Sequence, residues 1–166
     1  LERVGVDSLL IPNSTLAELQ ALTLTQTRKD VTYTAEICTV DEYLGICREH
    51  GVFPVVELKW AIGLNNNDMT LFPKLFALIE KHGLVEEAVI LTSMQQSIEY
   101  IREHYPQLQC QWLRHQIQEG DYDWCEQWNV PLSVPHTSVT KEVIKSSQQM
   151  GKYVATWTVN EATDYE

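Results

Sequence analysis

The stretch Val52–Lys59, with the sequence VFPVVELK, decides the fold class of this chain. It is apolar and rich in β-branched residues, and it follows Gly51 directly, so it predicts a buried strand. Pro54 weakens this prediction for the first residues, because proline cannot donate a hydrogen bond to a neighbouring strand. Just upstream, Thr39 and Glu42 form a capping-box pattern for a helix that Gly51 ends. A helix followed at once by a buried strand is typical of parallel α/β folds.

The same alternation continues along the chain. Further helices are expected over residues 15–21, 71–82, 95–104 and 139–150, and a helical turn over residues 121–127. Further strands are expected over residues 88–93, 108–113, 130–134 and 153–159. Because we recognise no two-residue hairpin turn, we expect the five strands to run parallel in βαβ units. A closed eight-stranded barrel usually needs about 250 residues. We therefore expect residues 1–166 to be one α/β domain that is cut at both ends.

Composition argues against several classes of function. The chain has 12 basic and 23 acidic residues and a formal net charge of −11, which repels nucleic-acid phosphates, so no nucleic acid is expected as a partner. No apolar run approaches the ~20 residues that span a bilayer. No signal peptide is visible, so we expect a cytoplasmic protein. The scattered cysteines lack zinc-ligand spacing and are expected to be reduced and mostly buried. They are Cys38, Cys47, Cys110 and Cys125.

Glu57 and Lys59 are the most informative charged residues. They lie two positions apart at the carboxyl end of the first predicted strand, so they share one face of it. Burial of a charge is unfavourable unless the charge is paired or binds a metal. Two interpretations are open: a buried ion-pair network between strands, or a carboxylate ligand for a hard cation beside a lysine for a phosphate. Active sites of parallel α/β proteins lie at this end of the strands.

Other polar and aromatic residues also lie near predicted strand ends. Trp157 is either a core tryptophan or an aromatic wall for an organic substrate. Ser93 and Gln111 are candidates for lining a pocket, although each also fits an ordinary strand-end cap or a buried amide. His115 and His136 could reach the rim of a site, but loop histidines are more often structural, so we expect neither to be catalytic. No phosphate-binding glycine motif is present.

Several stretches of this chain occur in the order found in a known family. They are residues 16–19 (LAEL), 39–53 (TVDEYLGICREHGVF), 56–59 (VELK), 90–94 (ILTSM), 105–106 (YP), 111–113 (QWL) and 153–160 (YVATWTVN). On these residues the chain resembles the glycerophosphodiester phosphodiesterase family. The combination of VELK with a late TWTVN is the most specific part of the resemblance.

The resemblance implies a TIM (β/α)₈ barrel in which the five predicted strands are strands four to eight. It also implies metal-dependent hydrolysis of a small-molecule glycerophosphodiester to glycerol 3-phosphate and an alcohol. The implied cofactor is a divalent metal ion, calcium or magnesium. By matching position, Glu57 would be a metal ligand, Lys59 would lie near the phosphate and Trp157 would line the substrate pocket. Ser93 and Gln111 are kept as substrate-binding candidates.

The family's His-Arg-Gly and His-Asp motifs, and its strand that carries Glu-x-Asp, are not found in the chain. The resemblance therefore assigns no catalytic residue to it, and we expect the chain by itself to be nearly inactive. Two alternatives stay open. One is a truncated product that acts as a non-catalytic binding or scaffold piece. The other is a different metal-dependent TIM-barrel enzyme with the same strand-end glutamate. Neither the head group of the substrate nor the oligomeric state follows from the sequence.

Overall fold

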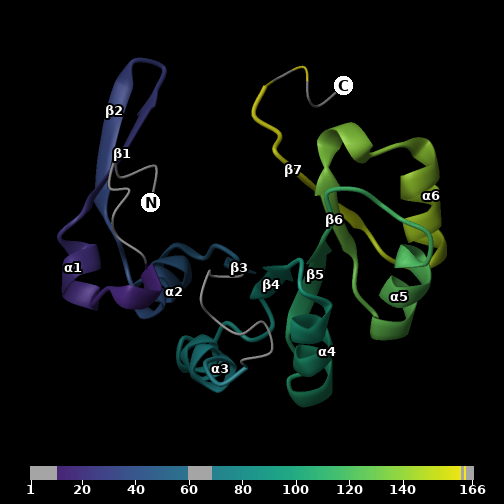
Figure 1. The fold of residues 1–166 in the computed structure, drawn as a ribbon, viewed down its shortest axis with the longest axis horizontal. Coiled ribbons are helices and arrows are strands. Elements are labelled where there is room, and N and C mark those ends of the chain that lie inside the picture. Colours follow the sequence, from purple (N-terminus) through teal and green to yellow (C-terminus); the bar gives the residue numbers. More distant parts are fainter. Residues whose placement is uncertain (1–10, 60–68, 162, 164–166) are drawn as a thin grey trace.

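A parallel β-sheet forms the centre of the protein. The structure is a computed structural model, which describes residues 11–59, 69–161 and 163. The sheet has five parallel strands in the order β3-β4-β5-β6-β7, so each strand pairs with the next one along the chain (Figure 1). The strands are β3 (Val55–Leu58), β4 (Val89–Thr92), β5 (Gln109–Leu113), β6 (Leu132–Pro135) and β7 (Val154–Trp157).

Helices connect these strands, as the alternating sequence pattern predicts. They are α1 (Leu16–Gln20), α2 (Val40–His50), α3 (Phe72–Lys81), α4 (Gln95–His104), α5 (Asp121–Trp128) and α6 (Lys141–Gln149). Short 3₁₀ turns lie at Ile11–Asn13 and His136–Ser138. Every predicted helix and strand is present, with ends shifted by a few residues, and the turn predicted over residues 121–127 is a full helix, α5. β3 begins only after Pro54, as expected for a residue without a backbone N–H.

Local capping accounts for where helix α2 begins and ends. The Thr39 side chain accepts a hydrogen bond from the Glu42 N–H, and the Glu42 carboxylate accepts one of 2.7 Å from the Thr39 N–H. The helix ends at Gly51, which has a φ of 62°. This left-handed conformation is easily adopted only by glycine. The predicted capping box is thus confirmed.

The core lies between one face of the sheet and the helices. Residues alternate along each strand, and one set of alternate residues is buried against helix side chains such as Ile79, Ile98 and Cys125. The buried strand residues are Ile90, Cys110, Trp112, Leu132 and Val134. Figure 1 shows α3 to α6 along the lower and right-hand side of the sheet. Because the helices bury one face of the sheet, the opposite face can carry polar functional groups.

On the opposite face, the alternate residues of β3, β4 and β5 are exposed or half-buried. They are Val55, Glu57, Val89, Leu91, Gln109, Gln111 and Leu113. Three of the four cysteines are buried, as predicted, and Cys38 is exposed. Among the residues described, no helix is both long and apolar enough to cross a membrane.

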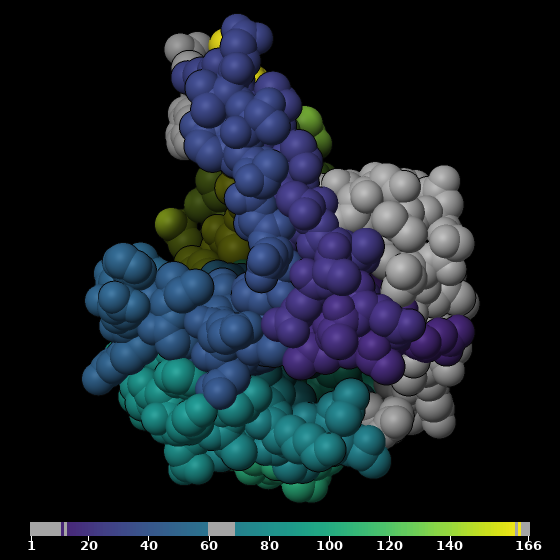
Figure 2. Space-filling view, turned by 90° about the vertical axis from the view of Figure 1, so that its left-hand side faces the viewer, coloured from purple at the N-terminus to yellow at the C-terminus, as the bar shows by residue number. Residues whose placement is uncertain are grey.

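An antiparallel hairpin precedes the parallel sheet and was not expected from the sequence. Strands β1 (Thr23–Arg28) and β2 (Val31–Glu36) pair with each other and are joined by Lys29 and Asp30. Both turn residues have positive φ, 49° and 62°. The expectation of no two-residue hairpin turn is therefore wrong. Such turns favour Asn-Gly or Asp-Gly, and a Lys-Asp pair does not carry that signal. All residues of both strands are exposed, and the hairpin projects from the protein as a finger (Figure 2).

Candidate active site at the carboxyl ends of the parallel strands

Glu57 and Lys59 form a direct ion pair at the end of β3. Lys59 Nζ lies 3.3 Å from Glu57 Oε2. The Lys59 side chain is 74% exposed and the Glu57 side chain 36%. The first interpretation of these residues, a buried ion-pair network between strands, is wrong for the described part of the chain, because the pair lies on one strand and faces solvent. An exposed cation beside an exposed carboxylate can bind a charged ligand without the large desolvation of a buried pair.

Thr92 anchors the end of β3 that carries this pair. Its hydroxyl donates a hydrogen bond of 3.1 Å to the Leu58 carbonyl oxygen and accepts one of 3.2 Å from the Met94 N–H. Thr92 is fully buried. Because Leu58 lies between Glu57 and Lys59, this contact holds the backbone of both charged residues against β4.

The sheet register places the predicted site residues on one face. Glu57 is paired with Leu91, and Leu91 with Gln111. Paired residues of parallel strands point to the same side, and so do residues two positions apart on one strand. Lys59 and Ser93 each lie two positions beyond a residue of this row. When the residue pairing is followed from β5 through β6 to β7, Trp157 also falls on this face. This is the face opposite the helix-covered core.

Ser93 and Gln111 are both engaged in hydrogen bonds. Ser93 is exposed, and its carbonyl oxygen accepts a hydrogen bond of 3.3 Å from the indole N–H of Trp112. The Gln111 amide donates one of 2.9 Å to the Tyr153 hydroxyl. Tyr153 immediately precedes β7. The hydrogen bond between the Gln111 and Tyr153 side chains therefore crosses over Pro131, the residue just before β6. The short proline ring leaves space for the two longer side chains to meet.

A second contact over β6 joins His115 to Trp157. Their ring centroids are 5.1 Å apart and the planes are at 84°, an edge-to-face arrangement. Pro135, which is paired with Trp157, occupies the position on β6 between them. Sequence reasoning placed His115 only on a loop and did not connect it to Trp157. The available signal was alternation, because His115 lies an even number of positions beyond Gln111 and Leu113.

Arg114 holds the segment that carries His115. Its backbone N–H donates a hydrogen bond of 2.9 Å to the Ser133 carbonyl oxygen, which extends the β5–β6 ladder by one residue. The Arg114 guanidinium lies 4.6 Å from the Trp112 ring centroid and donates hydrogen bonds of 3.0 and 3.2 Å to the two carboxylate oxygens of Asp121. A bidentate pair with stacking orients both side chains, so the residue just before His115 is anchored through its side chain and its backbone.

The described residues do not complete a metal site. No group of three or more His, Cys, Asp or Glu side chains among them is arranged to hold a metal ion. Calcium and magnesium take six or more ligands, mostly oxygen. Glu57 is exposed at the strand end and offers one carboxylate, so it fits the role of a single ligand. A complete site needs further ligands that these residues do not provide.

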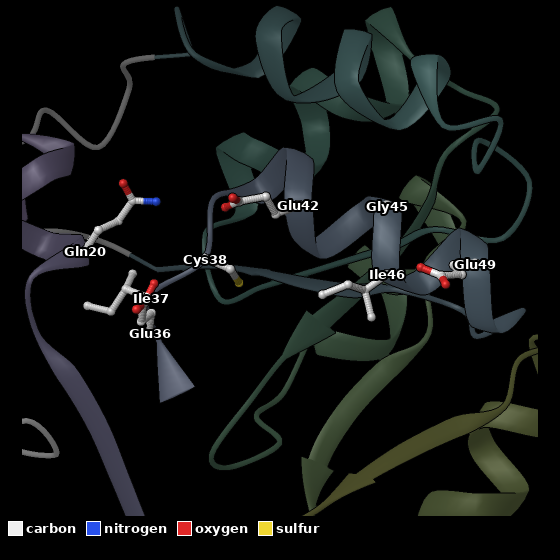
Figure 3. A pocket seen from close by; sticks show the side chains of 8 residues that line it. All are labelled: Gln20, Glu36, Ile37, Cys38, Glu42, Gly45, Ile46 and Glu49. Carbon is white, nitrogen blue, oxygen red and sulfur yellow. The ribbon is translucent and has the colours of Figure 1, made fainter. Parts of the chain in front are cut away.

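A separate groove of about 470 Å³ lies beside helix α2 (Figure 3). It shares no residue with the site at the strand ends. Its lining includes three glutamates, and Glu42 among them is already bonded to Thr39 in the helix cap. Because the glutamate carboxylates are negatively charged, the groove disfavours an anionic ligand. The lining residues are Gln20, Glu36, Ile37, Cys38, Glu42, Gly45, Ile46 and Glu49.

Comparison with protein families and with solved structures points to one family. The model of the glycerophosphoryl diester phosphodiesterase family matches residues 1–166. No curated protein matches. A protein from Silicibacter pomeroyi DSS-3 assigned as a glycerophosphoryl diester phosphodiesterase has a structure similar to this chain, with a TM-score of 0.79 and 19% identity, over 93% of this chain and 60% of that one.

Two further solved structures are similar. One is assigned as a glycerophosphodiester phosphodiesterase from Galdieria sulphuraria, with a TM-score of 0.75, 15% identity, and coverage of 93% of this chain and 62% of that one. The other is a glycerophosphodiester phosphodiesterase from Parabacteroides distasonis, with a TM-score of 0.70, 14% identity, and coverage of 91% and 60%. This chain thus spans about 60% of the length of these structures. The likeness confirms the predicted incomplete α/β barrel with five parallel strands.

Proposed function

Since the chain belongs to the glycerophosphoryl diester phosphodiesterase family, we propose that it forms part of an enzyme that hydrolyses glycerophosphodiesters. The products would be glycerol 3-phosphate and an alcohol. In this reaction water attacks phosphorus, the bond from phosphorus to the alcohol oxygen breaks, and the leaving alcohol takes up a proton. The proposal treats residues 1–166 as one domain. A cytoplasmic location and the lack of a nucleic-acid partner remain predictions.

The observation that carries this proposal is the exposed Glu57–Lys59 pair on the same face as Trp157. The Lys59 amine would bind a non-bridging phosphate oxygen, as lysine commonly does. The Glu57 carboxylate at 3.3 Å orients that amine and would be one ligand of a divalent cation. The cation, calcium or magnesium, would polarise the phosphate when bound. Ser93 and Trp157 would line the substrate pocket, together with Gln111.

The proposal assigns no general acid or base to the described residues. Their contribution is to bind and orient the substrate. Removal of an electrostatic contact that strengthens in the transition state lowers kcat/KM by about 10²–10³-fold. An exposed ion pair contributes only about 0–1 kcal/mol to stability. Loss of activity without loss of folding is therefore the signature expected for Glu57 and Lys59.

The test measures glycerol 3-phosphate released from glycerophosphocholine by the intact protein. We expect Lys59→Met and Glu57→Gln each to lower kcat/KM by at least about 100-fold, with unchanged thermal unfolding. Lys81→Met is the matched control, because Lys81 is also an exposed lysine in an ion pair, with Asp41. A chelator should abolish turnover, and added calcium or magnesium should restore it.

Two results would contradict the proposal. If the intact protein releases no glycerol 3-phosphate from glycerophosphodiesters, with either metal present, the enzyme assignment fails, and a non-catalytic binding or scaffold role becomes the better interpretation. If Lys59→Met and Glu57→Gln turn over substrate as fast as Lys81→Met, the assignment of this site fails.

A further inference from the structure

The imidazole of His115 lies just beyond the carboxyl end of β5. The residue is exposed, and in the described part of the chain its ring makes the edge-to-face contact with Trp157 and no hydrogen bond. An imidazole has two ring nitrogens, one of which donates and one accepts when the ring is neutral. His115 therefore has unused capacity for both kinds of hydrogen bond beside an aromatic surface.

Trp157 has a polar group without a hydrogen-bond partner. Its indole N–H is buried and, among the described residues, has no acceptor. A buried donor without a partner is unfavourable, and such atoms in natural proteins call for an explanation. The two rings thus lie together, with the His115 nitrogens open to solvent and one buried indole N–H without an acceptor.

The backbone next to each ring is anchored in the fold. Arg114, the residue before His115, is fixed by the Asp121 carboxylate and by the Trp112 ring. Trp157 is paired with Pro135 at the end of β6. Rigid positioning of a polar group is what selective recognition of a small ligand requires.

The same face of the sheet carries Lys59 at its other end, on β3, where the phosphate is proposed to bind. A ligand that reaches from β3 towards β5 and β7 presents to His115 one of the two groups attached to phosphorus. A glyceryl group carries hydroxyls, each of which both donates and accepts a hydrogen bond, as the imidazole does. A choline group carries no donor and would need only the aromatic ring.

We propose that His115 is a specificity-determining residue, which hydrogen-bonds a hydroxyl of the substrate's glyceryl group while that group lies against Trp157. This inference rests on the proposed phosphodiesterase function and adds which part of the substrate this end of the site selects. Trp157 supplies the apolar surface, and His115 supplies the discrimination between a hydroxylated group and a plain alkyl group.

The experiment compares two substrates in the intact protein: glycerophosphocholine and an analogue whose glyceryl group is replaced by propyl. His115→Phe keeps an aromatic ring against Trp157 but removes both nitrogens. We expect it to raise KM for glycerophosphocholine about tenfold, the effect of one lost hydrogen bond of about 1.4 kcal/mol, with kcat little changed. KM for the propyl analogue should stay as in the wild type.

His115→Gln keeps a donor and an acceptor and should restore KM for glycerophosphocholine to within about threefold of the wild type. His50→Phe is the control, because His50 is an exposed histidine at the end of α2. Thermal unfolding of each variant reports any general loss of structure. If His115→Phe does not fold, His115→Leu takes its place, because it also removes both nitrogens and should raise KM for glycerophosphocholine but not for the propyl analogue.

The outcomes separate this inference from the function it rests on. A wild type with no activity overturns both. An active wild type whose selectivity between the two substrates is unchanged in His115→Phe overturns the role of His115 alone. An equal rise of KM for both substrates also overturns it, because it would indicate binding of the shared phosphate or a purely structural effect.

Discussion

The Gln111 amide and the Tyr153 hydroxyl are joined by a hydrogen bond of 2.9 Å that links β5 to the start of β7 across β6. Gln111→Ala should lower the free energy of unfolding by about 0.5–1.5 kcal/mol, the net contribution of one hydrogen bond. Tyr153→Phe removes only the hydroxyl and is the matched partner in a double-mutant cycle. Urea unfolding of both single variants and the double variant measures the coupling. Strictly additive effects would show that the bond contributes nothing in solution.

Thr92 should be more important for stability than its size suggests. Thr92→Val preserves the shape of the side chain but leaves the Leu58 carbonyl and the Met94 N–H without their buried partner. We expect a loss of about 1–3 kcal/mol in unfolding free energy. Thr92→Ser keeps both hydrogen bonds and is the control. Urea denaturation would contradict the argument if the valine variant were as stable as the serine variant.

Asp41 gives the chain a stability contribution that depends on pH. A hydrogen bond from Lys81, and a second with His82, hold the pKa of the Asp41 carboxyl below its usual value. A carboxyl group whose pKa is lowered by folding stabilises the protein above its ordinary pKa of about 3.9. That contribution is lost as the pH falls through the lowered value.

Asp41→Asn should therefore lower Tm at pH 6, and its difference from the wild type should shrink below about pH 4. Asp123→Asn is a matched control, because Asp123 also lies in the first turn of a helix, α5, and shares any effect of the helix dipole. Thermal scans from pH 2 to pH 7 would measure both variants. A constant difference between Asp41→Asn and the wild type over this range would disprove the linkage.

The cysteines should differ sharply in reactivity. Burial raises the pKa of the Cys110 and Cys125 thiols to about 12, so almost no thiolate forms near neutral pH. Cys38 is exposed. A chromogenic disulfide reagent at pH 8 should modify Cys38 rapidly, and Cys110 and Cys125 only after unfolding. Cys38→Ser should remove the rapid phase. Rapid modification of Cys110 or Cys125 in that variant would show that the core opens readily.

Local features of this fold were predictable because they depend on neighbouring residues. The cap of α2 needs only Thr39 and Glu42 at its start, and Gly51 at its end. Placement of Glu57 and Lys59 on one face follows from the two-residue repeat of a strand. The hairpin turn at Lys29 and Asp30 was not predictable in this way, because neither residue type favours positive φ as glycine does.

The sequence by itself thus determined the order of the helices and of the five parallel strands, and which of their residues share a face, since both depend on backbone geometry over a few residues. Only the tertiary structure brought Gln111 to Tyr153, which are 42 positions apart, and His115 to Trp157. Those contacts depend on the register of three adjacent strands and on Pro131 and Pro135, which lie between the contacting side chains. No pattern within a single segment contains that information.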